Sequence, residues 1–142
     1  MFPEKPEPGL VLRYTFLWKH EAERGRDDGA KDRPVLVVVV LAGGGEAVVA
    51  PITTSAPREG APVIEVPESV RRHLGLDADR CWISLSILNR FVWPGPDLRP
   101  IPGRSPASTV CGFVPRRLLD AVKARLMREL SRSIPGLVVR RS

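Results

Sequence analysis

The stretch that decides the fold is residues 33–55, RPVLVVVVLAGGGEAVVAPITTS. Residues 35–41 form an unbroken apolar run rich in valine, and residues 47–52 form a second apolar run. β-Branched side chains favour strands, and the glycines at 43–45 can form the turn between them. We therefore expect a buried hairpin at the centre of the fold.

Short strands flank this hairpin on both sides. Residues 10–18 alternate in polarity, which predicts a half-buried strand with Arg13 and Thr15 on its polar face. The face expected in the core carries Leu10, Leu12, Tyr14, Phe16 and Trp18. Residues 62–66 and 81–88 are further predicted strands, and residues 89–102 are an aromatic, proline-rich connection.

Two helices are expected. Residues 67–74 begin with Pro-Glu-Ser and are followed by Gly75, which is typical of a brief helix with a glycine beyond its end. Pro115 opens a longer amphipathic helix. Its apolar side carries Leu118, Leu119, Val122, Leu126 and Leu130, and its basic side carries Arg116, Lys123, Arg125, Arg128 and Arg132. The expected fold class is mainly β (α+β), a small barrel with a short helix and a C-terminal amphipathic helix.

Composition bounds the class of protein. The chain has 142 residues, two histidines and two cysteines, Cys81 and Cys111, which are far apart in sequence. Since no Cys-x-x-Cys pair or His/Cys cluster is present, we expect no metal and no cofactor. No apolar run approaches the roughly 20 residues of a membrane-spanning helix, and residues 1–9, MFPEKPEPG, lack the apolar segment of a signal peptide. We expect a cytoplasmic protein with no membrane contact.

The net charge of +6 suggests nucleic-acid binding, but the surplus is local. Residues 112–142 carry eight Lys or Arg and two Asp or Glu, whereas residues 1–111 carry fourteen of each sign. A binding site within the first 111 residues must therefore be argued from individual side chains. We expect a flexible arm at residues 1–8, one barrel domain at 9–134 and a basic tail at 135–142.

Arg33 stands just before the first apolar run of the hairpin, and Thr53 ends the second. In an antiparallel hairpin these two positions lie side by side at one rim. A planar guanidinium beside the hydroxyls of Thr53, Thr54 and Ser55 suits a phosphate group. The plainer alternatives are that Arg33 is a solvated charge paired with Asp32 and that Thr53 is a strand-end hydroxyl.

Several motifs follow one another in a distinctive order. They are His20-Glu21, a polar loop with glycine, Arg33-Pro34, an apolar strand, Pro51-Ile52-Thr53, the strand Val63-Ile64-Glu65-Val66, and Leu74-Gly75-Leu76 before an amphipathic helix. This order, over about residues 9–130, resembles the MazF/PemK/Kid family of type II toxin–antitoxin toxins. The resemblance implies an SH3-like barrel that is a homodimer and cleaves single-stranded RNA without a metal. It also implies a cognate antitoxin protein, whose extended segment occupies the RNA groove.

The resemblance also implies roles for single residues. Arg33 matches the catalytic arginine of the family, Thr53 its catalytic Thr or Ser, and His20-Glu21 a His-Glu pair of some members. An arginine is too basic to accept a proton, so we assign Arg33 to stabilising charge on the phosphate. His20, with an ordinary pKa of about 6.5, is the first candidate for proton transfer, and Glu21 is the second. Further RNA contacts are expected from Arg24, Arg26, Lys31, Thr54, Ser55 and Arg58.

The chain also departs from the family pattern. Leu10 follows Gly9 where the family usually has an acid, the segment 21–33 is longer than usual, and Ser84 and Ser86 stand where some members have Arg and Asp. An alternative function is therefore a barrel of the same fold that binds RNA or a protein without cleaving. A third hypothesis is an interaction module whose basic helix meets an acidic partner.

Overall fold

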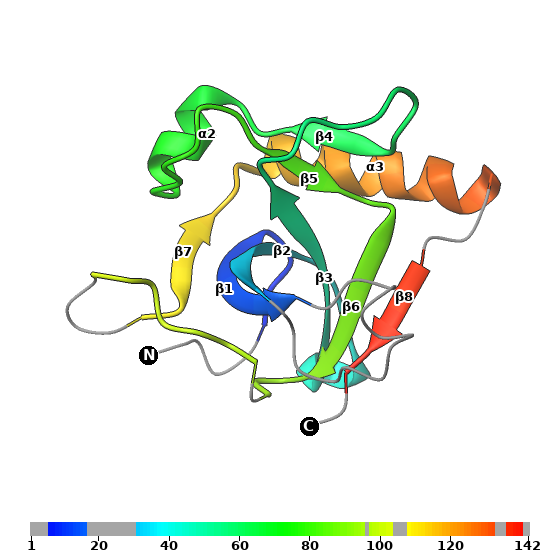
Figure 1. Cartoon of the computed structure of the whole chain (residues 1–142). Helices are drawn as coiled ribbons and strands as arrows, with labels where there is room; N and C mark the ends of the chain where they lie inside the picture. Colours follow the sequence, from blue (N-terminus) through cyan, green and yellow to red (C-terminus); the bar gives the residue numbers. More distant parts are fainter. Residues whose placement is uncertain (1–5, 17–30, 96, 104–107, 133–135, 141–142) are drawn as a thin grey trace.

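The apolar hairpin predicted from residues 35–52 is the centre of the structure. In the computed structural model, which describes residues 6–16, 31–95, 97–103, 108–132 and 136–140, strands β2 (Lys31–Leu41) and β3 (Glu46–Thr53) pair antiparallel, with Val35 opposite Pro51 (Figure 1). A 3₁₀ turn, η1 (Ala42–Gly44), joins them, and Gly43 has a φ of +64°. Glycine adopts this left-handed conformation without a steric penalty, so the glycine triplet lets the chain reverse tightly.

The other strands are added to both edges of this hairpin. Strand β1 pairs with β2, and β3 pairs with both β5 and β6 along different parts of its length. The bounds are β1 (Leu10–Phe16), β4 (Val63–Glu65), β5 (Trp82–Ser84), β6 (Ile87–Val92), β7 (Val110–Phe113) and β8 (Gly136–Val139). The order along the main path is β4-β5-β3-β2-β1-β7, and β6 connects β3 to β8. The pairs are antiparallel except β6–β8, and within the described ranges β4 and β7, the ends of this path, do not pair.

Two apolar clusters explain why β2 is apolar from Val35 to Leu41. One cluster lies between the sheet and the helices α2 (Glu68–His73) and α3 (Arg116–Arg132), and it includes Leu36, Leu74 and Val122. The other lies on the opposite side of β1 and β2 and includes Tyr14, Phe91 and Val138. A strand covered on both faces needs apolar side chains at successive positions, so the unbroken run from Val35 onward is the expected pattern.

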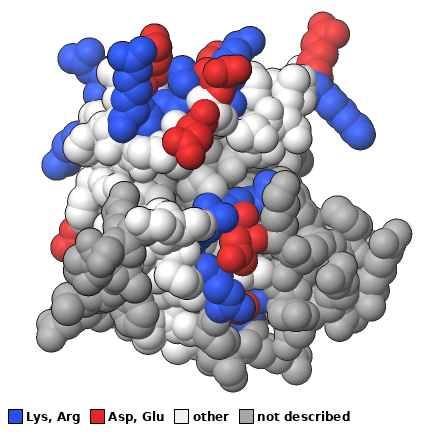
Figure 2. Space-filling view, turned by 60° about the vertical axis from the view of Figure 1, so that its left-hand side comes forward, with Lys and Arg blue, Asp and Glu red and all other residues white. Residues whose placement is uncertain are grey.

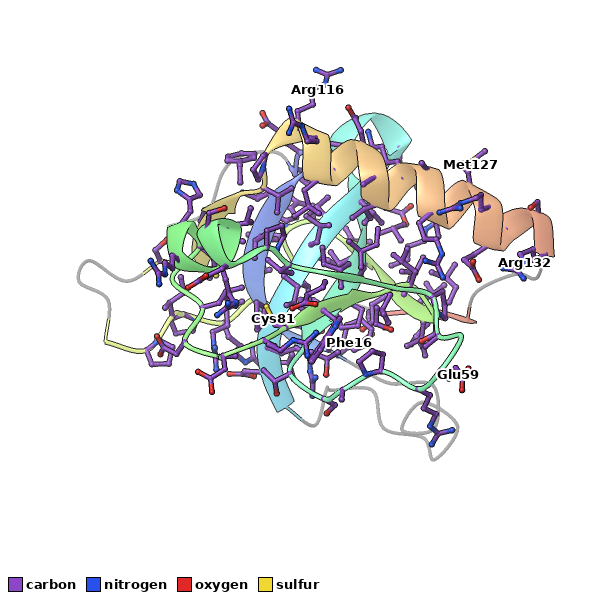
Figure 3. The ribbon with its side chains drawn as sticks, turned by 90° about the horizontal axis from the view of Figure 1, so that it is seen from above. Phe16, Glu59, Cys81, Arg116, Met127 and Arg132 are labelled. Atoms are coloured by element: carbon purple, nitrogen blue, oxygen red, sulfur yellow. The ribbon has the colours of Figure 1, made fainter. Side chains whose placement is uncertain are left out.

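The helices agree with the prediction, with one exception. Leu118, Val122 and Leu126 of α3 are buried, and the basic residues of this helix are mostly exposed. Leu130, which was predicted on the apolar side, is 45% exposed because it lies one turn beyond Leu126, the last α3 residue in the core. Met127 points away from the sheet (Figure 3).

Three predictions about strands need correction. The strand predicted at 81–88 is two strands, β5 and β6, and β6 continues to Val92. Strand β7 was not predicted. Residues 135–142 were predicted as a basic tail, but β8 lies in this range, paired with β6, and Arg140 after it is 3% exposed. The charge of Arg140 predicts a solvated tail. Arg140 can nevertheless be buried because it pairs with a carboxylate that is distant in sequence, that of Asp97.

Strand β1, the N-terminal arm and the search for a membrane-spanning helix complete the comparison with the sequence. The predicted core face of β1 is buried from Leu10 to Phe16, but the strand is not half-buried as predicted, because Val11 and Thr15 on its other face are buried as well; Trp18 lies outside the described ranges. Of the predicted N-terminal arm, Pro6 is buried, and residues 1–5 are likewise not described. Within the part of the chain that is described, no helix combines the length and apolar character needed to cross a bilayer.

Candidate functional site

A cavity of about 820 Å³ lies where the start of β2 and the end of β3 approach the turn after α2. Figure 2 shows basic and acidic side chains gathered in a recess on this side of the molecule. One part of the cavity lining is polar and includes Arg13, Asp32, Arg33 and Thr54. The other part is largely apolar and consists of Pro34, Ile52, Gly75, Leu76, Ala78, Cys81, Ile101, Pro102 and Gly103, with Asp77 beside them.

Arg33 lines this cavity from β2, and Thr54 lines it from the residue directly after β3. The β2–β3 pairing ends with Val35 opposite Pro51, and the same register continued by two residues sets Arg33 across from Thr53. Thr54, however, lines the cavity, and Thr53 accepts a hydrogen bond at Oγ1 from the backbone N–H of Ser55, at 3.2 Å. Of these three residues, Arg33 and Thr54 line the cavity and Thr53 does not.

Asp32 is held next to Arg33 by two neighbours. It lies directly opposite Thr15 in the β1–β2 register, and the Thr15 hydroxyl donates a hydrogen bond of 2.8 Å to its Oδ1. The guanidinium Nε of Arg99 lies 4.0 Å from the same oxygen. Because Asp32 is fixed in this way, the polar wall of the cavity contains an oriented carboxylate as well as guanidinium groups.

Arg13 lines the cavity from β1, opposite Pro34. Its backbone is held on both sides, since its N–H donates to the Thr109 carbonyl at 2.9 Å and its carbonyl accepts from the Arg99 N–H at 3.0 Å. Its Nε is buried and has no hydrogen-bond partner among the described residues. Sequence reasoning put Arg13 on the polar face of its strand but did not include it in the site. The sequence signal that could have identified Arg13 as a site residue is a single arginine within a largely apolar strand.

The turn after α2 forms the apolar wall. Gly75, at a φ of +70°, ends the helix, and the Arg71 Nη1 donates to the Ala78 carbonyl at 2.7 Å, which braces the turn. Cys81, labelled in Figure 3, lines the cavity together with this turn and is 1% exposed, and burial raises the pKa of its thiol. A raised pKa keeps this thiol protonated at neutral pH, so it behaves as an apolar group.

The remaining predicted site residues fall into two groups. Ser55 and Arg58 are exposed in the segment that follows β3, and neither belongs to the cavity lining. His20, Glu21, Arg24, Arg26 and the side chain of Lys31 lie outside the described residues. The roles predicted for these residues therefore remain predictions.

Ser84 and Ser86 contact each other. These are the positions at which some members of the MazF/PemK/Kid family, which the sequence resembles, have Arg and Asp. Their hydroxyl oxygens are 3.0 Å apart, and Ser84 is 6% exposed. Neither lies in the cavity lining. Two hydroxyl groups joined in this way do not replace an acid–base pair, so proton transfer would need other groups.

In the described ranges, no three His, Cys, Asp or Glu side chains come together as metal ligands. Comparisons of the sequence with models of protein families and with curated proteins find no match.

Proposed function

We propose that this protein is a MazF/PemK-like endoribonuclease, the toxin of a type II toxin–antitoxin system. The observation that carries the proposal is that Arg33, near the start of β2, and Thr54, directly after Thr53 at the end of β3, line the same cavity. A guanidinium with neighbouring hydroxyl groups is suited to a phosphodiester. The order of strands and helices along the chain further supports an SH3-like barrel as the type of fold.

The proposed reaction cleaves single-stranded RNA, such as mRNA, without a metal. The 2′-oxygen attacks the adjacent phosphorus while its proton passes to a base. The bond from phosphorus to the 5′-oxygen breaks, and that oxygen takes up a proton from an acid. The products are a 2′,3′-cyclic phosphate and a free 5′-hydroxyl. In this scheme Arg33 stabilises the charge on the phosphate oxygens, Thr53 and Thr54 orient the phosphate, and His20 and Glu21 are the candidates for proton transfer.

The test uses long single-stranded RNA in EDTA with the wild type, Arg33→Ala, Arg33→Lys, Thr53→Ala and Thr54→Ala. Loss of one charge-stabilising donor typically lowers the rate about 10²- to 10³-fold, which is our expectation for Arg33→Ala. Arg72→Ala is the matched control, because Arg72 is an exposed arginine on α2 that pairs with Glu68. RNA with a 2′-deoxynucleotide at the cleaved position should resist cleavage. Full activity in both Arg33 variants would contradict the assignment.

The contact between Ser84 and Ser86 favours a second candidate, a barrel of this fold that binds RNA or a protein without cleaving. The same experiment separates the two. If the wild type binds RNA but leaves it intact in EDTA and in magnesium, the non-catalytic function replaces the endoribonuclease.

The proposal also includes partners, namely a cognate antitoxin and a second copy of the chain in a homodimer. Coexpression with a short acidic protein encoded beside the gene, followed by copurification, tests the antitoxin. Light scattering of the purified protein measures its mass and tests the dimer. A growth arrest on expression that Arg33→Ala abolishes and the antitoxin relieves would support the toxin function.

A further inference from the structure

Arg13 provides a second guanidinium for the cavity that contains Arg33. The two residues come from adjacent strands and both line the cavity; the β1–β2 register pairs Arg13 with Pro34 and Arg33 with Tyr14, so their side chains leave the sheet on opposite faces. The Nε of Arg13 is buried and makes no hydrogen bond within the described part of the chain. Burial of a guanidinium donor without an acceptor is costly, and a turn of the Arg13 side chain toward an anionic ligand in the cavity would give this donor an acceptor.

The position of Arg13 is fixed by its backbone. The Thr109 carbonyl accepts from its N–H, and the Arg99 N–H donates to its carbonyl. Arg99 also approaches Asp32, whose Oδ1 accepts from the Thr15 hydroxyl. A guanidinium carried by a strand that is held in this way needs little reorganisation to bind a ligand, which favours affinity.

The cavity has the size and the two kinds of wall that suit one nucleotide. Its volume of about 820 Å³ lies within the range of roughly 300–1,000 Å³ that is usual for small-ligand sites. Arg13 and Arg33 lie in the polar wall, while Ile52, Leu76 and Ile101 provide an apolar surface for a flat base. The carboxylates of Asp32 and Asp77 can accept hydrogen bonds from the amino groups of a base edge.

We propose that Arg13 binds a phosphate of the RNA strand and that this cavity holds one nucleotide, with its base against the Ile52–Leu76–Ile101 surface. The inference rests on the proposed function, because it names how that site holds its substrate. Arg33 stabilises the reacting phosphate, whereas Arg13 contacts the phosphate of a flanking nucleotide and fixes the strand in register. RNA is favoured over an acidic peptide because its base edges carry amino groups that can donate to the two carboxylates of the cavity, which acidic side chains lack.

The test measures binding of a fluorescent single-stranded RNA with 2′-O-methyl groups, which lacks the attacking hydroxyl and cannot be cleaved. We expect Arg13→Ala to weaken binding about 10- to 100-fold, the range for a lost hydrogen bond to a charged group, and to reduce the salt dependence by about one counterion. Arg13→Lys keeps the charge and should retain part of the affinity. Leu76→Ala should weaken binding with an unchanged salt dependence, and Arg72→Ala should leave both quantities unchanged.

A second measurement uses the wild type alone and does not depend on the folding of a variant. Phenylglyoxal modifies arginine side chains, and mass spectrometry reports the site. We expect the bound oligonucleotide to protect Arg13 while Arg72 reacts at the same rate with and without it. Equal modification of Arg13 in the two states would overturn the inference, as would wild-type affinity and salt dependence in a folded Arg13→Ala variant. It would also be overturned if an acidic peptide, and not the oligonucleotide, bound in an Arg13-dependent manner.

The outcomes distinguish this inference from the proposed function. If the wild type cleaves RNA and Arg13→Ala cleaves it with an unchanged KM, the function stands and the role of Arg13 is wrong. If the oligonucleotide binds in an Arg13-dependent manner but the wild type does not cleave RNA, the binding site stands and the endoribonuclease activity is wrong.

Discussion

A carboxylate oxygen of Asp97 lies 2.9 Å from the guanidinium of Arg140, and the two side chains are 9% and 1% exposed. The same guanidinium donates to the Thr15 carbonyl at 2.8 Å, to the Tyr14 hydroxyl at 3.3 Å and to the Asn89 side-chain oxygen at 3.4 Å. Arg140 therefore joins β1, β6 and the segment after β6, and it attaches the chain directly after β8 to the rest of the core. Its charge is compensated on several sides, which is the condition for burying an ion.

Removal of either partner should be strongly destabilising. Arg140→Met leaves the Asp97 carboxylate buried without its cation, and such a loss typically costs about 3–5 kcal/mol of unfolding free energy. The exposed pair of Arg72 and Glu68 is the control, for which Arg72→Ala should cost at most about 1 kcal/mol. Urea denaturation measures both variants. If Arg140→Met loses no more stability than Arg72→Ala, the buried network does not stabilise the fold.

Stability should fall at alkaline pH because of Tyr14. Burial raises the pKa of this phenol, with the Arg140 guanidinium opposing the shift and Asp97 adding to it. In the unfolded chain the phenol ionises near about pH 10, whereas in the folded protein it keeps its proton to higher pH. The stabilising contribution is complete below that pH and is lost as the pH rises toward the folded pKa.

Tyr14 is the only tyrosine, so the phenolate absorbance reports this residue alone. We expect little phenolate in the folded protein above pH 10 and its full appearance in urea at the same pH. In Tyr14→Phe the alkaline loss of stability should be smaller than in the wild type. Ionisation of folded Tyr14 at an ordinary pKa would contradict this prediction.

Gly95 and Gly60 form a matched pair of glycines. Both have a positive φ, +67° and +77°, but a Cβ at Gly95 would lie 2.9 Å from the Val92 carbonyl oxygen, whereas at Gly60 it would meet nothing within 4 Å. Alanine pays a conformational cost of roughly 1–2 kcal/mol at either position. Gly95→Ala should lose a further 1 to 3 kcal/mol or so from the clash with the backbone. Thermal denaturation of the two variants measures the difference, and equal losses would show that the chain relieves this contact freely.

The two cysteines should differ in reactivity. Cys81 is 1% exposed with a pKa raised by burial, while Cys111 is partly exposed. Since the thiolate is the nucleophile, a thiol reagent should modify Cys111 first and Cys81 only slowly until the protein unfolds. Peptide mapping with time identifies the sites. Fast labelling of Cys81 in the folded protein would mean that the apolar wall of the cavity opens readily.

Local sequence patterns were sufficient for the elements whose burial depends on near neighbours. The hairpin follows from two apolar runs around glycines, and α3 follows from the spacing of Leu118, Val122 and Leu126. The hairpin register, with Val35 opposite Pro51, runs toward Arg33 and Thr53, whose neighbouring positions remain a prediction from the sequence. These features could be predicted because each depends on residues close together in the chain.

The missed features depend on distant partners. β8 has a short apolar sequence before arginines, and Arg140 is buried because Asp97, Thr15 and Asn89 come to it from other segments. Arg13 enters the cavity because Thr109 and Arg99 hold its strand there. The break between β5 and β6 occurs where β3 changes from one partner to the other. None of these contacts leaves a periodic signal in the local sequence.

The attachment of Arg140 to β1 has a consequence for protein synthesis. The Thr15 carbonyl and the Arg140 guanidinium are 125 residues apart. The ribosome adds about 5–20 residues per second. Once the central hairpin and β6 have been made, it therefore needs several more seconds to reach Arg140. During that interval the nascent chain exposes the apolar surface that β8 later covers, and chaperones have access to it. The core can therefore be completed only after translation has reached Arg140. An mRNA truncated before the Arg140 codon would yield a product that cannot complete its fold.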